Sequence, residues 1–399
     1  MTTELIMICM AALIVIGILL HHPSRTLGIP SLLIFMGVGL ALGNGEFDFV
    51  YDDLAQTAWI GGLALNVIVF VGGLNTSTDK IKVAYKEGGM LASFGVVFTT
   101  IIFAGILYVL LDFNFLLCLL FAAVVSSTDA AAVFSILESK KLKLKEETDT
   151  ILEFESATND PVAMLMVIVL TEMVLSSSQS VSLSSLSITL FTQVIVAIVV
   201  GLIVARIAVW LLNSISLSEY GLIPVFVLAS FIIATYGAEF LGGNILLASY
   251  IAGVVIGNFI KRGQQVNLHF FNSLSWLAQA LMFIVLGLQI FPQMLMTVFW
   301  ASLIPAILLI VVARPLAVQL CYLPFPKASW RKRLFISMIG LKGATPIVFA
   351  LIPAAAGVPD AINIVHMVFF IMIFSVFIQG GAIGPLADKL GLVQTPKKD

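Results

Sequence analysis

Charged residues are scarce in this 399-residue chain: they make up 11% of the sequence, against about 25% in an average soluble protein. Hydrophobic residues account for 60%. This balance excludes a water-soluble fold and leaves no stretch for a separate soluble domain. The net charge of −2 says little, because in a membrane protein the placement of charge matters more than its sum. We expect no nucleic-acid partner.

Cysteine is rare as well. Cys9, Cys118 and Cys321 lie far apart inside apolar runs, without the spacing of metal ligands, so we interpret them as packing residues and expect no cofactor. The first apolar run lacks a basic start and a small-residue cleavage site. It is therefore predicted to be a retained first helix and not a signal peptide.

Apolar runs are what the sequence has in abundance, and they recur from end to end. A run of about 20 residues is long enough to cross a hydrocarbon core roughly 30 Å thick as a helix. Thirteen such segments are predicted, at residues 5–20, 30–43, 57–74, 89–111, 114–138, 151–175, 188–213, 219–241, 244–260, 274–291, 296–322, 334–356 and 362–386. The fold class is therefore an all-α polytopic membrane protein.

Lysine and arginine gather in the loops that follow odd-numbered segments. The basic positions are residue 25 and the clusters within 80–86, 140–145, 261–262, 327–333 and 389–398. No basic residue lies in a loop after an even-numbered segment. Because positive charge collects on the cytoplasmic side, we predict a multi-pass protein of the cell (inner) membrane with the N-terminus outside and the C-terminus in the cytoplasm.

The sequence also resembles itself at an offset of 214 residues. Gly39 and Gly73 match Gly253 and Gly287, within a longer run of matching apolar positions. The offset advances the segment count by seven, an odd number, so equivalent helices would run in opposite directions. An inverted-topology repeat of this kind is common in secondary transporters, whose substrate site lies near the midplane.

This repeat predicts how the chain is organised. Repeat one would cover about residues 1–175, a connector helix about 188–213, and repeat two about 219–392. Together they form a single transporter domain, and we expect no soluble regulatory domain in this chain.

Two matching segments read as broken helices. The offset sets Thr128 opposite Lys342 and Asp129 opposite Gly343, amid hydroxyls in one segment and glycines and Pro346 in the other. Two crossed discontinuous helices would place Asp129 at positive helix ends and Lys342 at negative ones, where it compensates their charge. The alternative is that small residues and hydroxyls only permit close packing.

A second acidic residue lies deep in the segment at 151–175. At 1.5 Å per residue, Asp160 is roughly 13 Å from the cytoplasmic end, near the midplane. A carboxylate there marks an ion or proton pathway by default. Ser156 and Asn159 precede it, and Thr128 adds a further oxygen. We predict that Asp160, Ser156 and Thr128 bind Na+ or K+, with Asn159 and Asp129 in the same site.

A neighbouring acid has a different role. Glu155 requires a counter-charge, and Arg314, roughly midway along its own segment, is the natural partner for a structural ion pair. Asp160 then remains without such a partner, and desolvation favours its neutral form. It can hold a proton or a cation, but not both. The alternative is that Asp160 pairs with Lys342 as a structural lock.

At these residues the sequence resembles the monovalent cation/proton antiporter superfamily, and specifically its NhaP-like branch. The resemblance covers essentially the whole chain. It implies a homodimer in which a six-helix core domain moves like an elevator. It also implies that Asn159–Asp160 goes with electroneutral one-for-one exchange, that Thr128, Ser156 and Asp160 line the ion site, and that Glu155 pairs with Arg314. Lys342 stands where an arginine is common.

The predicted function is secondary active antiport of a monovalent cation, Na+ or K+, against H+, and not an enzymatic activity. A cation channel or uniporter and an organic-anion symporter of similar fold are the alternatives, although no carbonyl filter sequence is visible. An intramembrane protease is weaker still, because His366 has no matching nucleophile motif and is interpreted as a packing residue. The sequence does not decide sodium against potassium, since the same oxygens serve both.

Overall fold

The computed structural model describes residues 31–43, 53–111, 113–129, 143–176, 183–215 and 219–394, with seven isolated positions between 8 and 19 and without the side chains of 31–32 and 183–187. Most of the predicted segment at 5–20, the last nine residues of the segment at 114–138, and the basic residues at 25, 140–141 and 397–398 lie outside these residues. Within them every regular element is helical, apart from one isolated bridge between Leu144 and Val393.

Eight helices in the described part of the chain are long and apolar enough to cross a membrane, by length and composition, and four shorter apolar helices accompany them. Each predicted segment from 30–43 onward contains a helix of the structure. The chain is therefore a multi-span helical protein, as its composition indicates.

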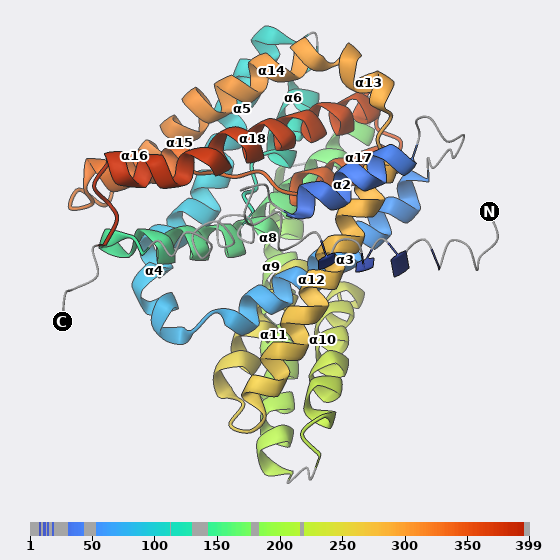
Figure 1. Cartoon of the computed structure of the whole chain (residues 1–399), viewed down its shortest axis with the longest axis vertical. Coiled ribbons are helices and arrows are strands. Elements are labelled where there is room, and N and C mark those ends of the chain that lie inside the picture. Colours follow the sequence, from blue (N-terminus) through green and yellow to red (C-terminus); the bar gives the residue numbers. More distant parts are fainter. Residues whose placement is uncertain are drawn as a thin grey trace.

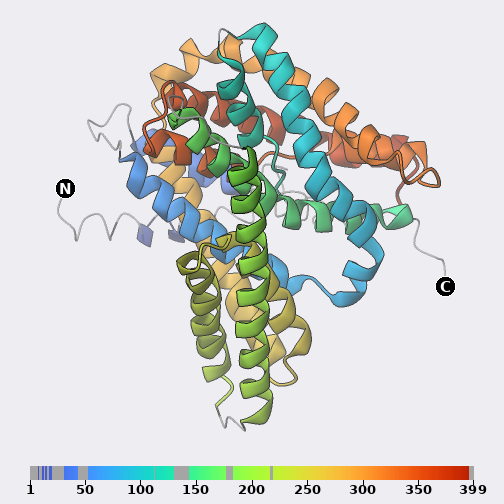
Figure 2. The same cartoon turned by 180° about the vertical axis from the view of Figure 1, so that it is seen from behind.

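The helices fall into two groups by packing. In the first group α11 packs on α3 and α9, α12 on α2 and α3, and α10 on α9 and α11. Figure 2 shows α9 and α10 side by side along the lower part of the molecule. The first group consists of α2 (Ser31–Leu42), α3 (Leu54–Asn75), α9 (Leu183–Ser214), α10 (Leu222–Phe240), α11 (Ile245–Phe259) and α12 (Gln264–Gln289).

The second group supplies both broken helices. Its members α4 and α6 pack on α8, and α14 and α17 pack on α18. It consists of α4 (Thr78–Met90), η1 (Leu91–Gly95), α5 (Val96–Leu110), α6 (Phe115–Val124), η2 (Lys145–Glu147), α8 (Thr148–Leu175), α13 (Pro292–Thr297), α14 (Phe299–Leu308), η3 (Leu309–Ala313), α15 (Arg314–Cys321), α16 (Trp330–Met338), α17 (Thr345–Ala355) and α18 (Ala361–Lys389). The main contact between the groups is α17 against α3. In Figure 1 α5, α6, α14 and α18 lie in the upper half, and α9, α10 and α11 in the lower.

Helix boundaries depart from the predicted ones where polar residues extend a helix. The segment predicted at 274–291 is α12, which begins ten residues earlier at Gln264, and the segment predicted at 89–111 is the second part of a continuous run from Thr78 to Leu110. Apolar runs mark only the membrane-embedded part of a helix. Side-chain caps set several of the true starts, such as Ser77, which accepts from the backbone N–H of Lys80, and Asn244, which accepts from that of Leu247.

Two glycine crossings hold the first group together, and they are equivalent under the 214-residue offset. Where α2 crosses α12, a Cβ on Gly39 would lie 3.0 Å from the Cα of Gly287. Where α11 crosses α3, a Cβ on Gly253 would lie 3.1 Å from the Cα of Gly73. Each crossing needs glycine on both helices so that the backbones can approach. The offset turns one crossing into the other, as a two-fold relation between the halves requires.

Candidate functional site

Two interruptions in helical structure meet at the centre of the second group. The helix α6 ends at Val124, and residues 127–129 continue without regular structure; α16 ends at Met338, and α17 begins only at Thr345. The backbone N–H of Asp129 donates to the carbonyl of Leu341 over 2.8 Å. One strand-like hydrogen bond therefore joins the interruptions, and it satisfies backbone groups that neither helix serves.

Lys342 compensates the carbonyl end of α6. Its side chain is buried, and its ammonium donates to the carbonyl oxygens of Ser127 at 2.8 Å and Ser126 at 3.3 Å. Its own backbone N–H donates to the Ser375 hydroxyl over 2.9 Å. Carbonyls just beyond the C-terminus of a helix carry partial negative charge and lack intrahelical donors, so a cation stabilises them.

Asp129 occupies the opposite position. Its carboxylate lies directly against the Cα of Gly343, so closely that any side chain at position 343 would overlap it. Gly343 comes two residues before Thr345, the first residue of α17, where partial positive charge favours an anion. The mirrored acid and lysine thus each sit beside a helix end of opposite charge.

Hydroxyl and amide groups form two sets of hydrogen bonds at Asp160 and its neighbours on α8. The Ser127 hydroxyl donates to the Asp160 carboxylate. The Asn159 amide donates to the Thr128 hydroxyl oxygen at 2.5 Å, and the Thr128 and Ser156 hydroxyl oxygens lie 3.0 Å apart. Because an amide N–H can only donate, the proton of Thr128 is free to go to Ser156. The structure therefore joins Asn159, Thr128 and Ser156 in one hydrogen-bonded chain, and Ser156 lines the same cavity as Asp129 and Asp160.

A buried ion pair lies on the neighbouring face of α8. Arg314 donates to one carboxylate oxygen of Glu155, and the two side chains are 3% and 1% exposed. The π-helical turn η3 ends just before Arg314, and Pro315 follows it without a backbone N–H. The Arg314 side chain also passes 3.1 Å from the position that a Cβ on Gly340 would take. The ion pair therefore connects α8 to the interruption between α16 and α17, where Gly340 lies.

A cavity of about 570 Å³ reaches Asp160 from one side of the molecule. Asp129, Ser156 and Asp160 lie on its lining, together with the Lys80–Glu153 ion pair of 2.7 Å. Pro161 deprives the Ala157 carbonyl of its usual helical donor, and Ala157 also lines the cavity. The opposite wall comes from α3 and α12 of the first group.

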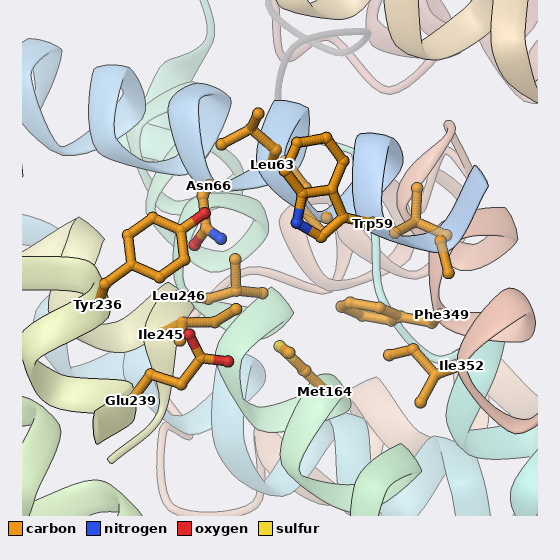
Figure 3. Close-up of a pocket in the computed structure, with 14 residues that line it drawn as sticks. Trp59, Leu63, Asn66, Met164, Tyr236, Glu239, Ile245, Leu246, Phe349 and Ile352 are labelled. Carbon is orange, nitrogen blue, oxygen red and sulfur yellow. The ribbon is translucent and has the colours of Figure 1, made fainter. Parts of the chain in front are cut away.

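A second, smaller cavity of about 250 Å³ lies between α3, α8, α10, α11 and α17. Figure 3 shows Tyr236, Glu239 and Asn66 on one side of it and Trp59, Phe349 and other apolar side chains on the other. Between the two cavities is a pocket of only about 20 Å³, lined in part by the buried Leu65, Met282 and Phe283. Asp160 is therefore reached from the larger cavity, and the passage toward the smaller cavity is constricted to this narrow pocket.

Sequence reasoning singled out the hydroxyl run but did not assign Ser127 to the site. The signal was present, since Ser127 stands beside Thr128 in a break of an otherwise apolar helix. It also missed Asn272, Ser275 and Gln279, which line the large cavity from α12. Their signal is a spacing of three and four residues, which places polar side chains on one face of a helix.

Comparison with known proteins relates the chain to a family of membrane transporters. Residues 10–389 match the family described as sodium/hydrogen exchanger, transmembrane. The chain is 36% identical to the K(+)/H(+) antiporter NhaP2 of Shewanella sp. (strain ANA-3) over 389 residues, which are 97% of this chain and 67% of that protein. It is 35% identical to the K(+)/H(+) antiporter NhaP of Alkalimonas amylolytica, over 99% of this chain and 68% of that one.

A solved structure shares the fold. The sodium proton antiporter MjNhaP1 from Methanocaldococcus jannaschii, at pH 8, superposes with a TM-score of 0.85 and 24% identity, covering 97% of this chain and 99% of that chain. The all-helical architecture is thus that of a known antiporter fold.

Proposed function

The chain belongs to the sodium/hydrogen exchanger family, and from this premise we propose that it exchanges a monovalent cation for protons by competition at Asp160. The observation that carries the proposal is the position of Asp160, which is 7% exposed at the lining of the large cavity. Its carboxylate accepts a hydrogen bond from a neutral group, the Ser127 hydroxyl. Such a carboxylate is satisfied by either a proton or a cation, and taking up one releases the other.

The ion site is proposed to consist of Asp160, Ser156 and Thr128. Hydroxyl and carboxylate oxygens are hard ligands that replace part of the hydration shell of a monovalent cation. Asn159 fixes the direction of the hydroxyl chain by donating to Thr128, and Asp129 adds negative charge on the cavity lining. Potassium is the first cation to test, because relatives 35–36% identical are named K(+)/H(+) antiporters.

We propose a one-for-one, electroneutral exchange. Of the adjacent pair at 159–160, only Asp160 carries a titratable group, and Glu155 is held by Arg314. One carboxylate then carries one positive charge in each direction. Lys342, bound to the carbonyls beyond α6, stays in place as the charge that the broken helix needs.

Alternating access is proposed to follow from movement of the second helix group against the first, in the manner of an elevator. The groups meet mainly at the interface between α17 and α3, and a cavity lies on either side of that interface. Moving Asp160 past this interface would close the large cavity and widen the smaller one. A homodimer in the cell membrane, with the C-terminus in the cytoplasm, completes the proposal and rests on the family resemblance and the positions of the basic residues.

The experiment is a dequenching assay in proteoliposomes with an imposed pH gradient, read by a pH dye on addition of KCl or NaCl. Wild type should collapse the gradient with at least one of the two cations, and clamping the membrane potential with valinomycin should not change the rate. Asp160→Asn should abolish the response. The matched control is Asp388→Asn, which removes an exposed carboxylate at the end of α18.

Each alternative has its own outcome in this assay. Cation flux that follows the membrane potential without moving protons would indicate a channel or uniporter. Gradient collapse that requires an organic acid would indicate a symporter. Normal exchange by Asp160→Asn would show that the ions do not compete at this carboxylate.

A further inference from the structure

The two cavities are lined by equivalent positions of the two repeats. Positions 272, 276 and 279 of α12 line the large cavity, and positions 58, 62 and 65 of α3 line the smaller one. Each pair differs by 214 residues, the offset that relates the glycine crossings. The first helix group therefore lines the two cavities with equivalent positions of α12 and α3.

Their chemistry is not the same. The large cavity receives Asn272, Trp276 and Gln279 from α12, together with Ser275. At the equivalent positions the smaller cavity has Ala58, Gly62 and Leu65. At these three positions the α3 wall has no side-chain oxygen, and the polar groups of the smaller cavity, Asn66, Tyr236 and Glu239, stand elsewhere on its lining.

Gln279 lies at the inner end of the polar wall. It lines both the large cavity and the narrow 20 Å³ pocket, where Asp129 and Thr345 are its neighbours on the lining. Its amide nitrogen donates to the Ser275 hydroxyl over 3.2 Å, which fixes the orientation of the amide and leaves its carbonyl oxygen as an acceptor. The charged residues of this cavity, Asp129, Asp160, Glu153 and Lys80, all belong to the second helix group.

We propose that Gln279 is a cation-positioning residue that acts from one side of the membrane only. Its carbonyl oxygen binds the partly dehydrated cation between the large cavity and Asp160, and Leu65 offers no such help from the other side. The inference deepens the proposed function and rests on it. A neutral oxygen suits this role, because a binding site along a conduction path must let the ion leave as well as arrive.

The proposal predicts an asymmetric effect of substitution. Gln279→Met keeps the size of the side chain and removes the oxygen. The KM for the cation should rise about three- to tenfold when the cation is supplied on the side of the large cavity, and kcat should change by less than twofold. From the opposite side the KM should stay unchanged. Gln279→Glu keeps an oxygen at the same reach and should restore the KM.

The reciprocal substitution tests whether an added oxygen raises the apparent affinity for the cation. Leu65→Gln adds an amide oxygen to the wall of the smaller cavity and should lower the cation KM about threefold from that side alone. The control is Ser273→Ala, which removes a hydroxyl of α12 that is exposed and does not line the cavity.

The measurement is exchange in right-side-out and inside-out membrane vesicles, with the cation titrated on the outside of each. Wild type reports on the proposed function by itself: if it does not exchange, that proposal fails and this one falls with it. If wild type exchanges, an equal KM change on both sides, or no change for Gln279→Met, overturns the role of Gln279. Size-exclusion profiles check that each variant folds. Should Gln279→Met not fold, the KM of Leu65→Gln from the side of the smaller cavity becomes the test of the proposal.

Discussion

The Glu155–Arg314 pair gives the sharpest prediction of stability. Removing Arg314 with Arg314→Met leaves the Glu155 carboxylate without its cationic partner in a site where both side chains are at most 3% exposed. Breaking a buried ion pair in this way costs about 3–5 kcal/mol, because a charge stays desolvated without compensation. Glu155→Leu should cost a similar amount. Each single variant is therefore expected to unfold far more readily than wild type.

The double variant Glu155→Leu/Arg314→Met should behave differently. Replacing both charges with apolar side chains removes the desolvation cost together with the attraction, and such replacements are often near neutral. We expect its loss to be under about 2 kcal/mol, well below the sum of the single losses. The assay is reversible unfolding in mixed detergent micelles with increasing SDS, followed by tryptophan fluorescence, in a double-mutant cycle.

The same variants separate structure from transport. A purely structural pair predicts that the double variant regains exchange in proteoliposomes along with its stability. Single losses below about 1 kcal/mol, or a double loss equal to the sum of the singles, would refute the reasoning that the pair is buried and coupled. Recovered stability without recovered exchange would show that Glu155 or Arg314 takes part in transport.

Two further predictions concern the crossing of the broken helices. Gly343→Ala places a methyl group where the Asp129 carboxylate lies, so it should abolish exchange while Gly381→Ala, with open space around it, has little effect in the same proteoliposome assay. Lys342→Met removes the donor to the Ser126 and Ser127 carbonyls and should lower the free energy of unfolding by about 1–3 kcal/mol in SDS titration, with Lys342→Arg recovering part of it, whereas an undiminished stability of Lys342→Met would contradict its role at the helix end.

Much of this site could be predicted from the sequence because charge inside a membrane is costly and therefore rare. In apolar segments Asp129, Glu155, Asp160, Arg314 and Lys342 stand out without any alignment, and their number limits the ways in which they can pair. Depth along a helix then follows from a fixed rise per residue. The interruption in the segment at 334–356 could also be predicted, because glycine and proline interrupt a helix where they cluster.

Helix ends and cavity walls were harder to predict. The start of α12 at Gln264 is polar, and hydropathy does not distinguish a polar helical turn outside the membrane from a loop. The neutral residues of α12 posed a different difficulty. An amide or hydroxyl in a membrane helix is cheap enough to be common, and only the position of α12 against Asp129 and Asp160 shows that Asn272, Ser275 and Gln279 line the cavity.

The inverted repeat resolves part of this difficulty, because it supplies a comparison within one chain. Gly39 and Gly73 recur as Gly253 and Gly287 since both crossings need the same close approach of backbones. Where equivalent positions differ, the difference points to what each side of the molecule requires: Leu65 is buried in the hydrophobic core, whereas Gln279 lies at the lining of the large cavity. The replacement of Leu65 by Gln279 is a difference of this kind. Symmetry in the backbone thus isolates asymmetry in the side chains, and in a transporter that works from two sides such asymmetry is expected to appear as different cation affinities at the two faces.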